Sequence, residues 1–131
     1  MRLVTALTPE AAPLIEHYRL EKVNSSSMFP LYRNDNIYLV VSGIGKTLAA
    51  AATAYLHAMS GELPNQLFLN IGIAGHWRTI TGAPRVASRI TDQSTGQTWY
   101  PSQIICDSLD RSPLITVEAV ERVYEEDAAY D

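Results

Sequence analysis

Residues 42–47 have the spacing in this chain that most directly suggests ligand chemistry. The segment is Ser-Gly-Ile-Gly-Lys-Thr, and it lies between an apolar run and an alanine-rich stretch. A strand followed by Gly-x-Gly presents backbone N–H groups at a helix N-terminus, where an anion or a polar hydroxyl can bind. The candidate binding residues are therefore Ser42, Gly43 and Gly45. The alternative is a tight strand-to-helix turn that needs two glycines for its geometry alone.

The Gly-Lys-Thr end of this segment also invites comparison with a phosphate-binding P-loop. The full signature has a glycine five residues before Gly45, whereas Val40 occupies that position here. Because Val40 lies within the expected strand, the loop is too short to wrap a triphosphate. A nucleoside triphosphate site is therefore disfavoured.

Two further candidates lie at the ends of expected strands. Residues 70–75, Asn-Ile-Gly-Ile-Ala-Gly, end an apolar run with small residues that let a backbone approach a ligand. Close packing of a helix on the strand explains such residues equally well. Glu10 falls in the first turn of a helix, where a glutamate is commonly only a surface residue favoured by the helix dipole. Ligands enter open α/β sheets at the carboxyl edge of the strands, so three signals at that edge together favour a site.

Strand and helix patterns alternate along the first three-quarters of the chain. Strands are expected at residues 3–7, 29–33, 37–42, 67–73, 85–91, 97–100 and 114–117, and helices from Thr8, over 46–60 and over 118–131. Thr8 is the expected N-cap of the first helix, and Gly61 ends the second. Asn34, Asp35 and Asn36 predict a hairpin turn because they tolerate left-handed backbone.

Apolar residues indicate how these elements pack. Residues 67–73 are nearly all apolar, as expected of a central parallel strand that is covered on both faces. One face of the second helix is expected to carry Leu48, Ala52, Tyr55 and Met59. The predicted class is α/β with a mixed sheet flanked by helices, in a single domain over residues 1–131.

Composition excludes several classes of protein. The chain has 131 residues, 47% apolar and 18% charged, with a formal charge of −4, which rules out disorder. Its apolar runs are too short for a membrane helix, so a cytoplasmic location is expected. Cys106 is the only cysteine, and the three histidines lack metal-ligand spacing, so neither a disulfide within the chain nor a metal site is expected. Two lysines and eight scattered arginines form no basic stripe for nucleic acid.

The order and spacing of three segments resemble the nucleoside phosphorylase superfamily. These are residues 5–10 (Thr-Ala-Leu-Thr-Pro-Glu), 42–46 (Ser-Gly-Ile-Gly-Lys) and 71–75 (Ile-Gly-Ile-Ala-Gly). The closest branch is the methylthioadenosine/S-adenosylhomocysteine nucleosidases, and the resemblance extends from residue 1 to about residue 117. It implies a mixed central sheet wrapped by helices, a homo-oligomer such as a dimer, and cleavage of the N-glycosidic bond of a purine nucleoside without a cofactor. Either water or phosphate serves as the acceptor in the superfamily.

The resemblance also implies roles for individual residues. Glu10 matches the acid that holds and activates the attacking water, and Ile73, Ala74 and Gly75 match the loop that lines the ribose and base pocket. Residues 92–100 match a segment that flanks the substrate, so Trp99 or Tyr100 would stack on the base, with core or interface packing as the alternative. The phosphorylases carry an arginine shortly before the pocket loop, and this chain has none there. Hydrolysis is therefore favoured over phosphorolysis.

Two elements of the family have no counterpart in this sequence. One is a Met-Glu pair that grips the ribose hydroxyls, and the other is a Ser-Asp pair that protonates the leaving base. We therefore expect the chain to be C-terminally truncated relative to the family, with little activity alone and with exposed apolar surface. The alternatives are a non-catalytic nucleoside-binding module and a structural subunit completed by a partner chain.

Overall fold

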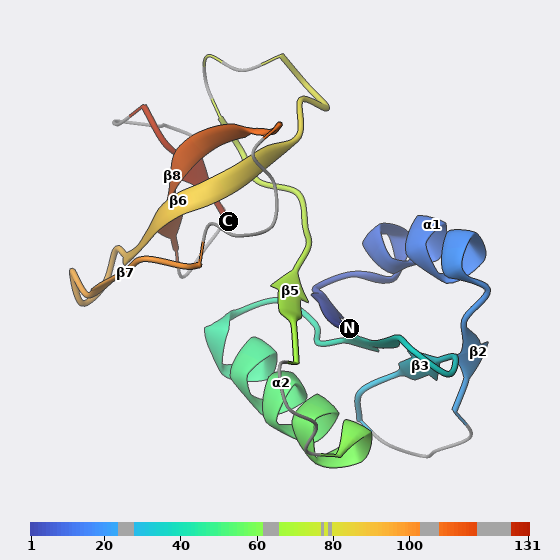
Figure 1. Cartoon of the computed structure of the whole chain (residues 1–131). Coiled ribbons are helices and arrows are strands. Elements are labelled where there is room, and N and C mark those ends of the chain that lie inside the picture. Colours follow the sequence, from blue (N-terminus) through green and yellow to red (C-terminus); the bar gives the residue numbers. More distant parts are fainter. Residues whose placement is uncertain (24–27, 62–65, 77, 79, 103–107, 118–126) are drawn as a thin grey trace. The chain divides into compact units, whose positions relative to one another are not determined.

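The computed structural model describes residues 1–131 apart from residues 24–27, 62–65, 77, 79, 103–107 and 118–126. The chain divides into two compact units, Met1–Gly72 and Ile73–Asp131, which are called unit 1 and unit 2 below (Figure 1). Each unit contains a sheet with both parallel and antiparallel pairs, and the class is α/β, as predicted.

Unit 1 is a five-stranded sheet with two helices. Its elements are β1 (Arg2–Thr5), α1 (Thr8–Tyr18), β2 (Glu21–Lys22), β3 (Leu31–Arg33), β4 (Tyr38–Val41), α2 (Lys46–Ser60) and β5 (Phe68–Asn70). The strand order is β2-β3-β4-β1-β5, in which β1 runs parallel to both β4 and β5. The carboxyl ends of these three strands therefore meet at one edge of the sheet.

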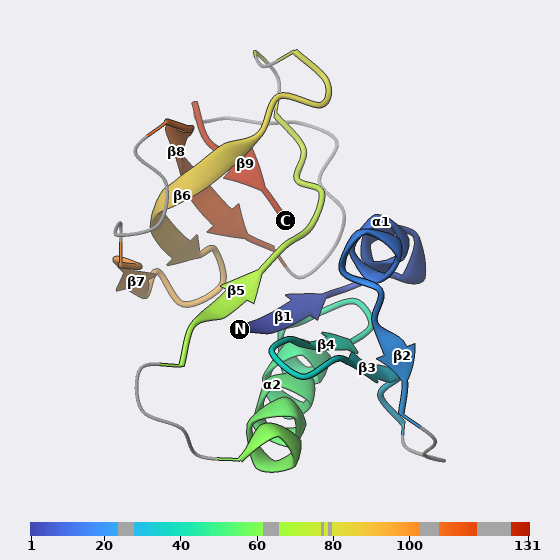
Figure 2. The ribbon, with the colours of Figure 1, turned by 45° about the vertical axis from the view of Figure 1, so that its right-hand side comes forward.

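The two helices cover opposite faces of this sheet (Figure 2). Successive side chains of a strand point to opposite faces, so Leu3 and Leu39 pack with Ala11 of α1, while Val4 and Val40 pack with α2. As a result β1 and β4 are buried on both faces, and they form the centre of unit 1.

The predicted hairpin is present, but its turn works differently from the expectation. The side-chain oxygen Oδ1 of Asn34 accepts hydrogen bonds from the backbone N–H groups of Asn36 and Ile37, each at 2.9 Å. Among the described non-glycine residues, only Arg19, at the end of α1, has a positive φ. The turn is therefore stabilised by side-chain capping of the backbone rather than by left-handed residues.

One local expectation about the helices is wrong, and a second is only half right. Leu7, not Thr8, is the N-cap of α1, because the helix begins at Thr8 and Leu7 has an extended backbone. The backbone N–H of Leu7 donates to Oε2 of Glu10. On the predicted face of α2, Ala52 is buried and Tyr55 packs against the same core, whereas Leu48 and Met59 are 38% and 45% exposed. Leu56 and Ser60 complete the buried face instead. The bounds of α2, by contrast, are those predicted, and Gly61 follows it with a φ of 70°.

The strand expected at the centre of the sheet lies at its edge. Within the described residues, β5 pairs with β1 alone, and Phe68 and Asn70 are exposed. An apolar run predicts that a strand is buried, but it does not predict which elements cover it or whether it lies at the centre or the edge of a sheet. Here β4 and β1 take the interior positions, because β4 pairs with β3 and β1, and β1 pairs with β4 and β5.

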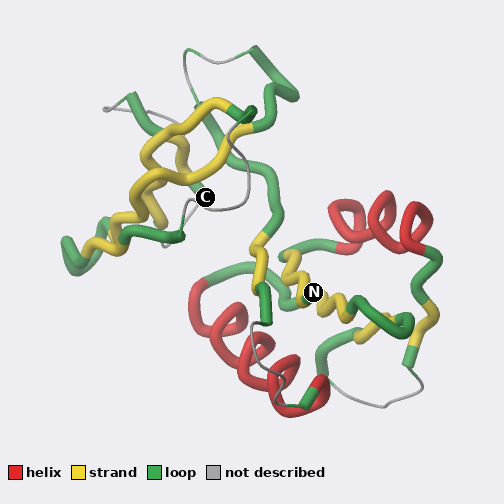
Figure 3. Tube along the Cα trace, in the orientation of Figure 1, coloured by secondary structure: helices red, strands yellow, loops and turns green. Residues whose placement is uncertain are grey.

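Unit 2 is a four-stranded sheet. Its strands are β6 (Arg85–Asp92), β7 (Thr98–Trp99), β8 (Asp110–Thr116) and β9 (Ala129–Tyr130), in the order β7-β6-β8-β9. The three strands predicted in this part are confirmed. The helix predicted over 118–131 falls partly on residues 118–126, which lie outside the described residues, and its end is strand β9 instead (Figure 3). The buried core of unit 2 is small, with Ile115, Ala128 and Tyr130 at its centre.

The described residues contain neither a membrane-spanning helix nor a metal-binding cluster. None of the helices there has the length and apolar character needed to cross a membrane. In the same part of the chain, no three His, Cys, Asp or Glu side chains come together in a way that could hold a metal ion.

Candidate functional site

Three segments that carry candidate functional residues meet at the carboxyl edge of the sheet in unit 1. The backbone N–H of Ser42 donates to the carbonyl of Thr5 at 2.8 Å, and that of Gly43 donates to Ala6 at 3.0 Å. On the other side of β1, the N–H of Ile71 donates to Val4 at 2.9 Å. Parallel pairing with β1 therefore brings the ends of β4 and β5 beside the start of α1, at the edge where ligands enter such sheets.

Glu10 is the acidic residue at this edge. It is the third residue of α1, and its Oε2 accepts a hydrogen bond of 2.8 Å from the backbone N–H of Leu7. Its Oε1 lies 3.4 Å from the position that a Cβ on Gly72 would occupy. The partly buried carboxylate is therefore held between the end of β1 and the chain that follows β5.

The glycine loop is shaped by its own backbone. Gly43 and Gly45 have φ values of 84° and 101°, a region that residues with a side chain rarely adopt. The hydroxyl of buried Ser42 lies within hydrogen-bond distance of two carbonyl oxygens, that of Gly43 at 2.8 Å and that of Thr5 at 3.2 Å. The turn geometry thus explains both glycines, and a ligand-binding role for Ser42, Gly43 and Gly45 stays a prediction.

Alanine substitutions at the two glycines separate backbone strain from steric crowding. A Cβ on Gly43 would lie 3.0 Å from Cδ1 of Leu48, whereas one on Gly45 would meet nothing within 4 Å. We expect Gly45→Ala to lower the free energy of unfolding by about 1 kcal/mol through strain alone, and Gly43→Ala to cost about 2 kcal/mol. Urea unfolding monitored by circular dichroism measures both. Equal losses at the two positions would show that crowding against Leu48 plays no part.

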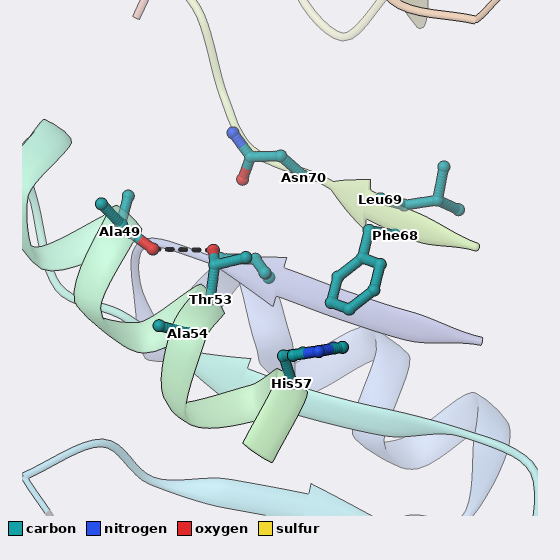
Figure 4. A pocket seen from close by; sticks show the side chains of 9 residues that line it. Ala49, Thr53, Ala54, His57, Phe68, Leu69 and Asn70 are labelled. Atoms are coloured by element: carbon teal, nitrogen blue, oxygen red, sulfur yellow. Dashed lines mark hydrogen bonds between the residues drawn. The ribbon is translucent and has the colours of Figure 1, made fainter. Parts of the chain in front are cut away.

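Two hollows border these segments. The smaller lies at the carboxyl edge, and its lining includes Thr8, Phe29, Ser42, Gly43 and Leu48. The larger lies between α2 and β5 and is mostly apolar, with the rings of His57 and Phe68 6.1 Å apart (Figure 4). In the larger hollow the hydroxyl of Thr53 donates to the carbonyl of Ala49 at 2.7 Å. The smaller hollow is therefore the one that coincides with the predicted glycine loop.

The remaining predicted site residues belong to unit 2. Ile73 is 82% exposed, and Gly75 exchanges two backbone hydrogen bonds of 2.8 Å with Tyr130. Trp99 and Tyr100 are 46% and 76% exposed, so core packing within unit 2 does not account for them. Roles for Ile73, Ala74, Gly75, Trp99 and Tyr100 toward a ligand stay predictions.

The sequence alone did not single out three groups at this edge. Leu7 contributes only its backbone N–H, which no side-chain pattern reveals. Gly72 lies within the small-residue segment at 70–75, where its closeness to Glu10 depends on strand pairing. The hydroxyl Oγ1 of Thr5, at the end of β1, is buried and has no hydrogen-bond partner among the described residues. A threonine just before the Glu10 segment was the available signal for the last of these.

The fold of the chain is similar to that of solved methylthioadenosine/S-adenosylhomocysteine nucleosidases and of a futalosine hydrolase, as the resemblance predicted. No protein-family model matches the chain, and no curated protein sequence matches it. The assignment of the fold therefore depends on solved structures.

Three of these structures illustrate the similarity. An MTAN from Chlamydia trachomatis bound to MTA has a TM-score of 0.71 at 20% identity, over 99% of this chain and 67% of that one. The 5′-methylthioadenosine/S-adenosyl homocysteine nucleosidase of Campylobacter jejuni has a TM-score of 0.70 at 14% identity, over 98% and 73%. The futalosine hydrolase of Helicobacter pylori strain 26695 has a TM-score of 0.73 at 14% identity, over 98% and 75%. This chain thus spans about two thirds to three quarters of the length of these proteins.

Proposed function

We propose that the site at the carboxyl edge of unit 1 binds a purine nucleoside and hydrolyses its N-glycosidic bond, with Glu10 as the residue that activates water. The observation that carries this proposal is the Glu10 carboxylate, which the Leu7 N–H holds in place at the edge where β1, β4 and β5 end. The nucleosidase fold supports the same conclusion.

The chemistry follows from the charge that develops during the reaction. As the bond between the base and C1′ breaks, the ribose becomes positively charged, and a carboxylate on the opposite side stabilises that charge. The same carboxylate can accept a proton from the attacking water as general base. We favour water over phosphate as the acceptor because residues 69 and 70, just before the pocket loop, are Leu and Asn rather than Arg.

We further propose that turnover by this chain alone is slow. No pair in this sequence matches the family's Met-Glu or Ser-Asp elements, so protonation of the leaving base would depend on solvent. General acid catalysis typically contributes about 10²–10⁴-fold to a rate. Binding of the nucleoside is therefore expected to be easier to detect than release of the base.

The test compares Glu10→Gln with a matched control on the same helix, Glu16→Gln, whose side chain is exposed. Protein in excess is incubated with adenosine or methylthioadenosine, with and without inorganic phosphate, and free adenine is quantified by chromatography. We expect Glu10→Gln to lower the rate of adenine release about 100-fold, Glu16→Gln to leave it unchanged, and phosphate to have no effect.

Calorimetry with the same nucleosides distinguishes the other outcomes. Saturable binding without any adenine release would favour a non-catalytic nucleoside-binding module. Neither binding nor release would refute the proposed function and favour a structural subunit. The expected homodimer, cytoplasmic location and absence of a cofactor stay predictions, and light scattering with size-exclusion chromatography tests the first.

A further inference from the structure

Gly72 lies beside the carboxylate of Glu10. A Cβ added to Gly72 would be 3.4 Å from Oε1, 3.9 Å from Cδ and 4.0 Å from Oε2 of Glu10. Among the described residues, apart from Gly72 and its two chain neighbours, these are the three nearest atoms to that position. Both residues belong to unit 1, where the backbone N–H of Ile71 fixes the end of β5 against β1 at 2.9 Å.

The backbone of Gly72 does not itself require glycine. Its φ lies outside the left-handed region, unlike those of Gly43, Gly45 and Gly61. An alanine at residue 72 would also make only ordinary van der Waals contact with the carboxylate, since its nearest approach is 3.4 Å. A substitution to alanine is therefore tolerated by the local geometry, and its main effect is to fill space.

That space lies beside Oε1, which is the carboxylate oxygen of Glu10 nearer to Gly72. Oε2 accepts the hydrogen bond from Leu7, which sets the orientation of the carboxylate. Oε1 lies on the side of Gly72. A water molecule that donates to a carboxylate oxygen sits at about 2.7–2.8 Å from it, and a methyl group on residue 72 would compete for that volume.

We propose that Gly72 is a positioning residue for hydrolysis, which acts by leaving room for the attacking water at Oε1 of Glu10. This inference rests on the proposed function. In the reaction, the water oxygen forms a bond to C1′ while its proton passes to the Glu10 carboxylate. The bond from C1′ to the base breaks, and the base leaves with the electron pair and takes a proton from solvent. Gly72 touches none of the reacting atoms; it determines whether water can reach Oε1.

The test is a double-mutant cycle with Gly72→Ala, Glu10→Gln and the double variant. We expect Gly72→Ala to lower the rate of adenine release about 100-fold while the KM for the nucleoside changes less than about threefold. In the Glu10→Gln background, Gly72→Ala should have no further effect, because the group through which it acts is gone. Far-UV circular dichroism and the urea midpoint should match those of the parent chain.

A second ligand keeps the inference testable if turnover is too slow to measure. A nucleoside analogue that carries an ammonium in place of the ribose ring oxygen mimics the developing cation. Calorimetry should show that Gly72→Ala weakens binding of this analogue about tenfold, with the same loss of effect in the Glu10→Gln background. Binding of neutral adenosine should change much less.

The outcomes separate this inference from the proposed function. If the parent chain binds the analogue but Gly72→Ala has equal effects with and without Glu10, Gly72 has only a structural role and the inference is wrong. An unchanged Gly72→Ala variant would refute it too. If the parent chain neither binds a nucleoside nor releases a base, the proposed function itself fails, and the role of Gly72 fails with it.

Discussion

Replacement of Arg2 by alanine is expected to lower the free energy of unfolding of unit 1 by about 3 kcal/mol. Arg2 is a charged residue buried in β1. Its Nε donates to Oγ of Ser60 and its Nη2 to the carbonyl of Ser60, each at 2.9 Å. The guanidinium also lies 5.4 Å from the ring centre of Tyr38. The side chain thus joins β1 to the last residue of α2. A positive charge at this position interacts favourably with the negative end of the helix dipole.

The expected loss has two parts that matched variants can separate. Arg2→Met keeps the aliphatic stem but removes the donors to the hydroxyl and carbonyl of buried Ser60. We expect this variant to lower the free energy of unfolding by about 2 kcal/mol. The remainder, about 1 kcal/mol, reflects packing of the stem. Arg33 is the control, because it is exposed and lies 6.0 Å from the same Tyr38 ring. Arg33→Ala is expected to change stability by less than about 0.5 kcal/mol.

Urea unfolding monitored by helical circular dichroism measures these differences, because both described helices belong to unit 1. If Arg2→Met were as stable as the parent chain, the cost of burying the guanidinium would equal the gain from its hydrogen bonds. Such a result would contradict a stabilising role for the contact between Arg2 and Ser60.

The second large effect is expected at Leu39, in the middle of β4. Leu39 is fully buried and packs with Leu3 and Ala11 between the sheet and α1. Leu39→Ala removes buried methyl groups and leaves a cavity, with an expected cost of about 3 kcal/mol. The comparison is Phe68→Ala in β5, where the larger side chain is already 37% exposed, and the expected cost is about 1 kcal/mol.

This pair of variants tests which strand occupies the centre of the sheet. The sequence pattern alone predicts the larger loss at the apolar run of residues 67–73, whereas the structure predicts it at β4. Unfolding in urea, followed by the same helical signal, provides the comparison. A larger loss for Phe68→Ala than for Leu39→Ala would refute the central position of β1 and β4.

Local signals in the sequence predicted much of this fold. Gly45 and Gly61 border α2, and the predicted and observed bounds agree because glycine at a helix end relieves left-handed strain within a few residues. The hairpin of β3 and β4 was also predictable, since Asn34 caps backbone groups only two and three residues away. Signals that act over so short a range need no information about the rest of the chain.

Predictions that depend on partners distant in the sequence were less successful. The buried face of α2 and the edge position of β5 both depend on the strands against which they pack. The same holds for the helix expected near the C-terminus, whose end pairs with β8 as strand β9. The expectation that residues 1–131 form one α/β domain stays a prediction.

Residue types and spacing by themselves identified Glu10, the glycine loop and the small-residue segment as candidates, because an acid or a flexible turn at the end of a strand is visible in a single sequence. Only the tertiary structure showed how these parts meet. Parallel pairing of β1 with β4 and β5 places the glycine loop against Thr5 and Ala6 and brings Gly72 beside the Glu10 carboxylate. The physical reason is that a contact between residues 62 positions apart exists only when strand register creates it.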